Sequence, residues 1–236
     1  MRAHFLILLL LLSPVLNRAG SDKALPEAEP LSRLYNELDL PGKGLDITVF
    51  RLALEGKHKL GQEGRLKNNS ILTIVDFSQS SRNRRLYVID LEHKKLLFNT
   101  FVAHGRNSGE EYASKFSNRS GSCMSSLGFY ITRQEAVGPN VGLSLVLEGV
   151  EKGINDRALE RGIIIHGADY ATEQFIRNTG RLGRSFGCPS LPPEETKPVI
   201  GTIKDGSCLF IYYPDQDYLR QSVFFCHKQE SAQTGL

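Results

Sequence analysis

Five short strand-like segments follow one another between residues 70 and 148, and this run is the feature that most constrains the fold. They read SILTIVDF, RLYVID, KLLFNTFVAH, GFYIT and SLVLEG. Each is rich in β-branched or aromatic residues and is bounded by Ser, Asn, Gly or charged residues, as strands usually are. Successive strands without helices between them predict an antiparallel or mixed sheet rather than a doubly wound fold. We therefore expect a mainly β fold, a sandwich or barrel, with peripheral helices.

Helical patterns flank this run on both sides. Asp46 is suited to cap a helix that extends to about Leu60. Residues 151–162 and 171–180 are also expected to be helical, and PPEETKPVIGTI begins with the proline and acidic residues typical of a helix N-terminus. The apolar segments IIIH and SCLFIYY predict further strands.

The first twenty residues have the pattern of an export signal. Arg2 supplies the positive region, Phe5–Leu12 the apolar core, and small residues near Ala19 a cleavage zone. The alternative is a membrane anchor, but the apolar run is shorter than the ~20 residues that a spanning helix needs. We therefore predict a signal peptide at 1–20 and an exported protein of the periplasm or cell envelope, with no membrane span in the mature chain.

The rest of the chain is expected to contain one large domain. We predict a linker with a short helix at 21–45, a catalytic domain at 46–217 and a polar C-terminal tail at 218–236. The formal net charge is +3, of which Arg2 and Arg18 in the leader contribute two. The remaining near-neutral balance gives no electrostatic case for a nucleic-acid partner. The oligomeric state is left open.

Cys188 lies in a turn, in RSFGCPSLP, rather than in an apolar run where a structural cysteine usually sits. Gly187 frees the backbone before it, and Pro189 restricts the backbone after it. This arrangement presents a thiol and its own amide at one place. A nucleophilic cysteine also needs a base, and His166 ends the apolar strand IIIH earlier in the chain. A lone histidine at a strand end is more often structural, and a lone cysteine is more often inert.

Several stretches together resemble the L,D-transpeptidases, the cysteine enzymes that cross-link peptidoglycan, in the variant with a G-R-S-x-G-C-P nucleophile loop. HGADY resembles the histidine strand and GRLGRSFGCPSLP the nucleophile loop. FVAHGRNSG and SSLGFYIT resemble segments that precede them in the family. The resemblance runs from about Ile71 to Tyr213 and implies the family's β-sandwich or barrel fold.

The resemblance also implies residue roles. Cys188 would be the nucleophile and His166 its base, with the imidazole oriented through the backbone carbonyl of Gly167. Ser185 and Gly187 would shape the loop, and the N–H groups of Gly187 and Cys188 would form an oxyanion hole. The positions that depart from the family pattern are Ser126, Phe186, Pro189 and Ser190.

Substrate contacts are less well defined. Arg184 or Arg181 would meet a terminal carboxylate of the substrate. His104 is a further candidate on the substrate side, although we favour a pocket-wall or structural histidine. Arg157 and Arg161 would either face the groove or lie on a solvated helix surface. Neither a metal site nor a cofactor is expected, since no H-x-x-x-H or C-x-x-C pairing occurs.

The implied reaction is acyl transfer on peptidoglycan stem peptides through a thioester on Cys188. If water resolves the thioester, the same site is an L,D-carboxypeptidase. Two other interpretations are a catalytically inactive peptidoglycan-binding module and a cysteine peptidase of another class. The four cysteines allow two disulfides; if Cys188 is free, Cys208 with Cys226 is the more natural pair, and Cys123 remains.

Overall fold

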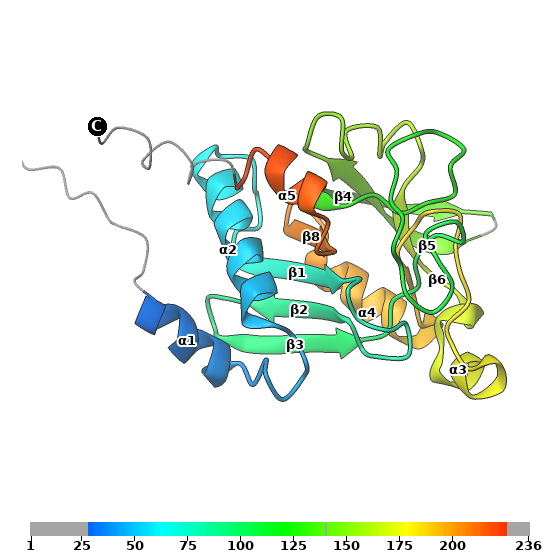
Figure 1. Ribbon diagram of the computed structural model, residues 1–236, viewed down its shortest axis with the longest axis horizontal. Helices are drawn as coiled ribbons and strands as arrows, with labels where there is room; N and C mark the ends of the chain where they lie inside the picture. Colours follow the sequence, from blue (N-terminus) through cyan, green and yellow to red (C-terminus); the bar gives the residue numbers. More distant parts are fainter. Residues whose placement is uncertain (1–27, 140, 226–236) are drawn as a thin grey trace, which may run out of the picture.

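The computed structural model describes residues 28–139 and 141–225 (Figure 1). The expected signal peptide lies outside the described residues. The elements, in chain order, are α1 (Ala28–Glu37), α2 (Ile47–Gln62), β1 (Ile71–Asp76), β2 (Leu86–Asp90), β3 (Lys95–Thr100), β4 (Gly128–Gly138), β5 (Gly142–Gly149), β6 (Ile164–Gly167), the 3-10 turn η1 (Asp169–Ala171), α3 (Glu173–Thr179), β7 (Ser190–Leu191), α4 (Pro193–Ile203), β8 (Cys208–Tyr212) and α5 (Gln216–Gln221).

The strands of the described residues form one mixed sheet in the order β3-β2-β1-β8-β4-β5-β6-β7. β8 comes last in sequence among these strands, yet it lies between β1 and β4, parallel to β1 and antiparallel to β4. Just after β3 the chain bridges to β7 through Ala103 and Ser190. The two edges of the sheet therefore meet, and the sheet is a nearly closed barrel. The expectation of a mainly β, barrel-like fold is confirmed.

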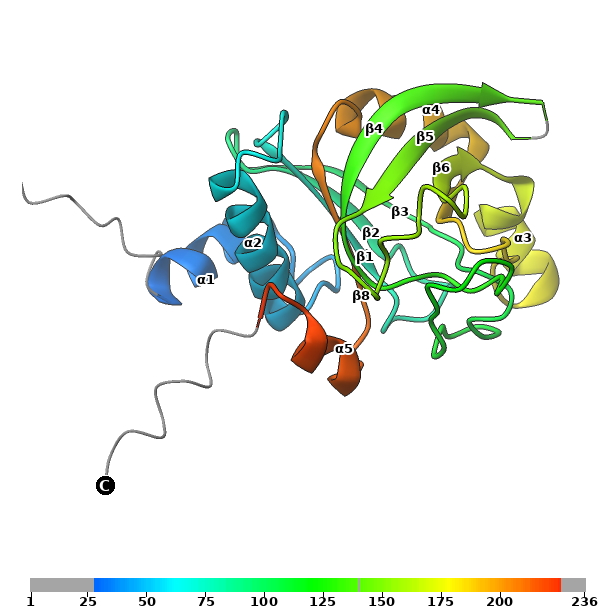
Figure 2. The ribbon, with the colours of Figure 1, turned by 90° about the horizontal axis from the view of Figure 1, so that it is seen from above.

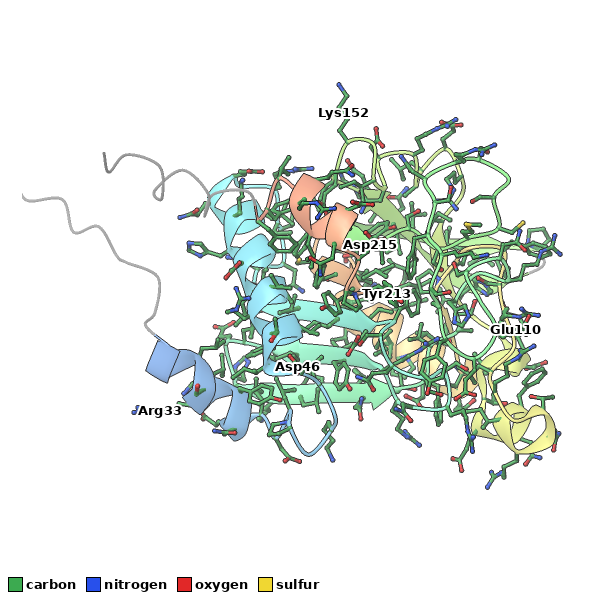
Figure 3. All side chains as sticks on the ribbon, in the orientation of Figure 1. Arg33, Asp46, Glu110, Lys152, Tyr213 and Asp215 are labelled. Carbon is green, nitrogen blue, oxygen red and sulfur yellow. The ribbon has the colours of Figure 1, made fainter. Side chains whose placement is uncertain are left out.

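The two longest helices cover opposite faces of this sheet (Figure 2). α2 packs on β1 and β8, and α4 packs on β6, β5 and β1. The side chain of Asp46 caps α2 by accepting a hydrogen bond from the Thr48 N–H at 2.7 Å, as expected (Figure 3). α3 ends at Gly180, which has a φ of 82° and so adopts the left-handed conformation that glycine tolerates best. These helices agree with the sequence patterns.

Residues 151–162 form a series of turns instead of the helix expected there. Gly153 and Gly162 have φ values of 79° and 63°, and a left-handed residue interrupts a right-handed helix. The Asn155 amide donates to two backbone carbonyls at the start of β4, each at 2.9 Å. Tertiary hydrogen bonds to β4 therefore replace the helical ones, and periodicity in the sequence does not reveal them.

Two of the expected boundaries, at 45/46 and at 217/218, fall inside packed structure. Leu38, Leu40 and Leu45, in the segment interpreted as a linker, are buried in the core. The C-terminal segment was expected to be polar and peripheral, but Tyr218 and Phe224 join the same core. The described chain from 31 to 225 thus packs around one core.

Glu151 fastens this C-terminal segment to β4. Its side chain is 1% exposed and accepts hydrogen bonds from the Phe129 N–H at 2.8 Å, the Tyr218 hydroxyl at 3.1 Å and the Ser222 hydroxyl at 2.5 Å. Burial raises the pKa of Glu151 above its usual value, and the three hydrogen bonds only partly oppose this effect.

The raised pKa makes stability depend on pH in a defined direction. A carboxyl group whose pKa is higher in the folded than in the unfolded state stabilises the fold fully below the unfolded pKa of ~4.3, and this contribution is lost as pH rises through the folded pKa. Urea unfolding should therefore show the wild type losing stability relative to Glu151→Gln between pH 4 and 8. As a control, Glu160 is exposed and its pKa is lowered by Arg157, so its contribution changes only below the unfolded pKa of ~4.3 and the curves for wild type and Glu160→Gln should run nearly parallel between pH 4 and 8. Parallel pH curves for wild type and Glu151→Gln would contradict the role of Glu151.

Candidate active site

His166 is held on β6 with a strand on each side. The register pairs it with Ser144 on β5 and with Ser190 on β7. Its Nδ1 lies 2.9 Å from the carbonyl oxygen of Gly167. A carbonyl can only accept, so Nδ1 carries the proton and Nε2 is the basic nitrogen of the neutral ring. Gly167 therefore lies where it orients the imidazole.

The loop that carries Cys188 is closed by the hydroxyl of Ser185. This hydroxyl donates to the carbonyl oxygen of Cys188 at 2.6 Å and accepts from the Gly187 N–H at 3.0 Å. Gly187 has a φ of 131°, a conformation that residues with a side chain rarely adopt. We expected the Gly187 N–H to be unpaired and ready for an oxyanion. Instead, Ser185 occupies it, because the tight loop turns the two groups toward each other.

The thiol of Cys188 points toward the start of β6. Sγ lies 3.8 Å from the carbonyl oxygen of Gly162, to which the thiol donates. Burial raises the pKa of Cys188. The backbone N–H of Ile164, the Arg161 guanidinium and the N–H of Cys188 itself act in the opposite direction, because each favours the thiolate.

His166 and Cys188 make no direct hydrogen bond to each other. Nε2 of His166 lies 3.1 Å from the hydroxyl of Ser190, which in turn lies 3.0 Å from the Tyr170 hydroxyl. The thiol and the imidazole thus each have another partner. Catalytic contacts are often formed only when substrate binds, so this arrangement is compatible with a dyad that forms later.

A cavity of about 1000 Å³ nevertheless brings the two groups together. Its lining includes Cys188, His166, Gly167 and Ser185, together with the exposed ring of Phe186. The remaining lining residues are Val141, Leu143, Gly162, Ile164, Ala168, Asp169, Tyr170, Pro193, Thr196 and Lys197. The cavity combines an apolar wall with one acidic and one basic side chain.

The arginines proposed for a substrate carboxylate are not among these lining residues. Arg181 and Arg184 form ion pairs with Glu110 at 2.8 Å and 2.5 Å; Figure 3 labels Glu110 at the end of the molecule opposite α1. Arg157 pairs with Glu160 at 2.7 Å on the surface. Each of these three guanidinium groups therefore already has a carboxylate partner.

Arg161 is half-buried and fixes the segment 117–126 beside the nucleophile loop. It donates to the carbonyl oxygens of Ser117 at 2.8 Å and Met124 at 2.6 Å, and to the hydroxyl of Ser126. Ser126 is one of the departures from the family pattern, and its hydroxyl accepts this hydrogen bond. This gives the departure at Ser126 a structural role.

His104 is buried behind the nucleophile loop and is absent from the cavity lining. Burial, with the neighbouring Arg85 charge, lowers the pKa of His104 to about 3, so the ring is neutral. Nδ1 accepts from Arg85 at 2.8 Å, and the His104 carbonyl accepts from the Ser185 N–H at 2.9 Å. His104 therefore supports the loop from behind and does not line the cavity.

Four residues at the site had no role in our sequence interpretation. Ser190 and Tyr170 contact His166 directly or through one hydroxyl, while Asp169 and Lys197 line the cavity. Tyr170 belongs to the HGADY motif, and Ser190 was noted only as a departure. Helical spacing shows that Lys197 shares a face with Pro193, but no local signal shows which face meets the cavity.

Other groups in the described residues offer no second site of this kind. Cys123, Cys188 and Cys208 are free, and Cys226, the suggested partner of Cys208, lies outside the described residues. No cluster of three or more metal-ligating side chains occurs in residues 28–139 and 141–225. Within those ranges, no helix has the length and apolar character needed to cross a bilayer.

Comparisons with known proteins find one matching family model and several similar structures. A family model described as the L,D-transpeptidase catalytic domain matches residues 42–212. The chain is similar to an L,D-transpeptidase from Mycobacterium smegmatis, with 13% identity and a TM-score of 0.38 over 61% of this chain and 59% of that chain. It is also similar to L,D-transpeptidase 3 from Mycobacterium tuberculosis, with 14% identity and a TM-score of 0.37 over 61% of this chain and 61% of that chain.

A third similar structure is the helical cell shape determining protein Pgp2 from Campylobacter jejuni. It shows 15% identity and a TM-score of 0.42 over 68% of this chain and 54% of that chain. The matched region thus spans roughly half to three fifths of these proteins. Comparison with curated proteins finds no match.

Proposed function

We propose a function from one premise: this chain belongs to the L,D-transpeptidase catalytic domain family, whose model matches residues 42–212. The protein is an exported cysteine acyltransferase that acts on peptidoglycan stem peptides. Its nucleophile is Cys188 and its base is His166. The observation that carries this proposal is the single cavity lined by both side chains, with the imidazole fixed by the Gly167 carbonyl.

The reaction begins with transfer of the thiol proton to Nε2 of His166. The thiolate attacks the carbonyl carbon of meso-diaminopimelate in a stem tetrapeptide, and the C–N bond to the terminal D-Ala breaks. The proton on His166 passes to the leaving amine, which leaves a thioester on Cys188. An amine from a second stem peptide then attacks the thioester and restores the thiol.

We propose that the N–H of Cys188 stabilises the oxyanion. This N–H is close enough to its own sulfur to favour the thiolate. The Gly187 N–H joins it only when Ser185 releases its hydrogen bond. We assign the contact with a substrate carboxylate to Lys197, the lysine in the cavity lining, in place of Arg181 and Arg184. Asp169 on the same cavity would meet a substrate ammonium group.

The test is product analysis. The purified protein is incubated with a disaccharide tetrapeptide that contains meso-diaminopimelate. The products are separated by chromatography, and their masses are measured by mass spectrometry. A cross-linked dimer with loss of D-Ala supports the transpeptidase, and a tripeptide without cross-links supports an L,D-carboxypeptidase that uses water. Binding of the tetrapeptide without any product would overturn both and leave the inactive binding module.

A further inference from the structure

The hydroxyl groups of Ser190 and Tyr170 form a chain that ends on His166. Tyr170 lies 3.0 Å from Ser190, and Ser190 lies 3.1 Å from Nε2. The hydrogen bond of the other ring nitrogen, Nδ1, decides which group donates in each of these two hydrogen bonds. Because Nδ1 donates to the Gly167 carbonyl, Nε2 of the neutral ring must accept from Ser190. Ser190 then accepts from Tyr170.

The backbone holds Ser190 rigidly in this place. It pairs with His166 across β6 and β7, and on its other side its N–H and carbonyl both bond to Ala103, at 3.3 Å and 2.9 Å. The side chain is fully buried. A hydroxyl clamped between two chain segments stays beside the imidazole through the reaction.

Tyr170 is also fitted to its place. Gly183 donates its N–H to the Tyr170 carbonyl at 2.8 Å. A Cβ at Gly183 would overlap the Tyr170 side chain, so glycine there makes room for the ring. Burial raises the pKa of Tyr170, so its hydroxyl keeps its proton at neutral pH. It can therefore serve as the outer donor of the chain.

We propose that Ser190 and Tyr170 are positioning residues for His166, in an inference that rests on the proposed function. In the resting enzyme they hold the tautomer in which Nε2 is free of a proton. When the thiol proton moves to Nε2, the new N–H donates to Ser190 or to the thiolate. The Ser190 hydroxyl then rotates to donate to Tyr170, whose own O–H turns toward the cavity. Both protonation states of His166 are satisfied by rotation of two hydroxyls.

Other charged groups lie near His166 and Cys188, and the variants described below leave them unchanged. Asp169 on η1 and Lys197 on α4 line the same cavity, and Arg161 acts on the thiol. Differences between wild type and a hydroxyl variant therefore report the hydroxyl alone.

The experiment measures the rate at which iodoacetamide alkylates Cys188 as a function of pH, followed on the Cys188 peptide by mass spectrometry. Loss of a hydrogen bond that stabilises the imidazolium disfavours the thiolate–imidazolium pair. Ser190→Ala should lower the rate at neutral pH about tenfold and move the midpoint up by about one pH unit. Tyr170→Phe should move it in the same direction by less. Ser190→Thr, which keeps a hydroxyl, should restore most of the wild-type profile.

Ser144→Ala is the matched control. Ser144 pairs with His166 on the opposite side, but its hydroxyl donates to the Ala136 carbonyl at 3.0 Å and makes no hydrogen bond to the ring. Ser144→Ala should therefore leave the pH midpoint of Cys188 alkylation unchanged. A second readout is the tautomer of His166 from its side-chain ¹⁵N shifts, which Ser190→Ala should change toward a mixture of both forms.

The outcomes separate the two proposals. If wild-type Cys188 reacts no faster than Cys123, and His166→Ala has no effect, the proposed function fails. If His166→Ala slows Cys188 but Ser190→Ala leaves both the pH profile and the tautomer unchanged, the positioning role is overturned while the dyad stands. An equal loss in Ser190→Ala, Ser190→Thr and Ser144→Ala with one common midpoint would also overturn it, because only packing would then matter.

Discussion

Replacing Cys188 by alanine is expected to abolish release of D-Ala from a stem tetrapeptide. No acyl-enzyme can form without the sulfur. Cys188→Ser should be almost as inactive, since a serine hydroxyl is a much weaker nucleophile than a thiolate at neutral pH. His166→Ala should lower the rate by ~10²–10⁴-fold, the usual contribution of a positioned general base. Released D-Ala and the intact mass of the acyl-enzyme measure both effects.

Cys123→Ala is the control for this prediction. Cys123 is also a free cysteine; its thiol donates to the carbonyl oxygen of Gly121 at 3.6 Å, and Cys123 is not among the residues that line the cavity. This variant should keep wild-type turnover. If a folded Cys188→Ala protein still releases D-Ala, another residue is the nucleophile and the proposed mechanism is wrong.

Of the variants named here, Arg85→Met is expected to lower the free energy of unfolding the most. The fully buried guanidinium donates to the carbonyl oxygens of Val102, at 3.2 Å and 3.0 Å, and Gln79, at 2.8 Å, and to Nδ1 of His104. It also lies 4.8 Å from the centre of the Phe77 ring. Burial lowers the pKa of Arg85 to about 9, so the group stays charged at neutral pH.

The variant would leave these acceptors buried without a donor. Each unsatisfied acceptor costs about 1–3 kcal/mol. Removing the buried charge also removes its desolvation penalty, but this gain offsets the cost only in part. The free energy of unfolding in urea should fall by about 3 kcal/mol. Activity should fall too, since the carbonyl of His104 accepts the Ser185 N–H of the nucleophile loop.

The neighbouring Arg84 provides the comparison. It is exposed, bonds to the Asn99 carbonyl at 3.4 Å and lies over the Phe101 ring. Contacts of this kind at a surface contribute up to about 1 kcal/mol, so Arg84→Met should have a small effect. Equal unfolding midpoints for Arg84→Met and Arg85→Met would show that the buried guanidinium does not support the loop.

Local sequence was sufficient to predict most elements. The β-branched runs correspond to β1 to β6 and β8, Asp46 caps α2, and Gly180 ends α3. Each of these depends on neighbouring residues alone, through propensity, capping or a left-handed glycine. The sequence patterns did not predict β7 and α5, and at 151–162 turns replace the expected helix because the side chain of Asn155 donates to the backbone at the start of β4.

The sequence by itself also supplied the candidate residues for the proposed chemistry, because Gly187, Cys188 and the strand ending at His166 form a motif in the chain. Only the tertiary structure decided what those residues contact. β8 enters between β1 and β4 by pairing with strands remote in the chain, and the same kind of pairing sets Ser190 beside His166. Nε2 of His166 bonds to the hydroxyl of Ser190, which the strand register brings within reach, whereas the Gly187 N–H bonds to Ser185 within its own loop. Non-local pairing and competition for hydrogen bonds leave no period in the sequence, so the sequence suggested the candidate residues but not the hydrogen bonds that they make.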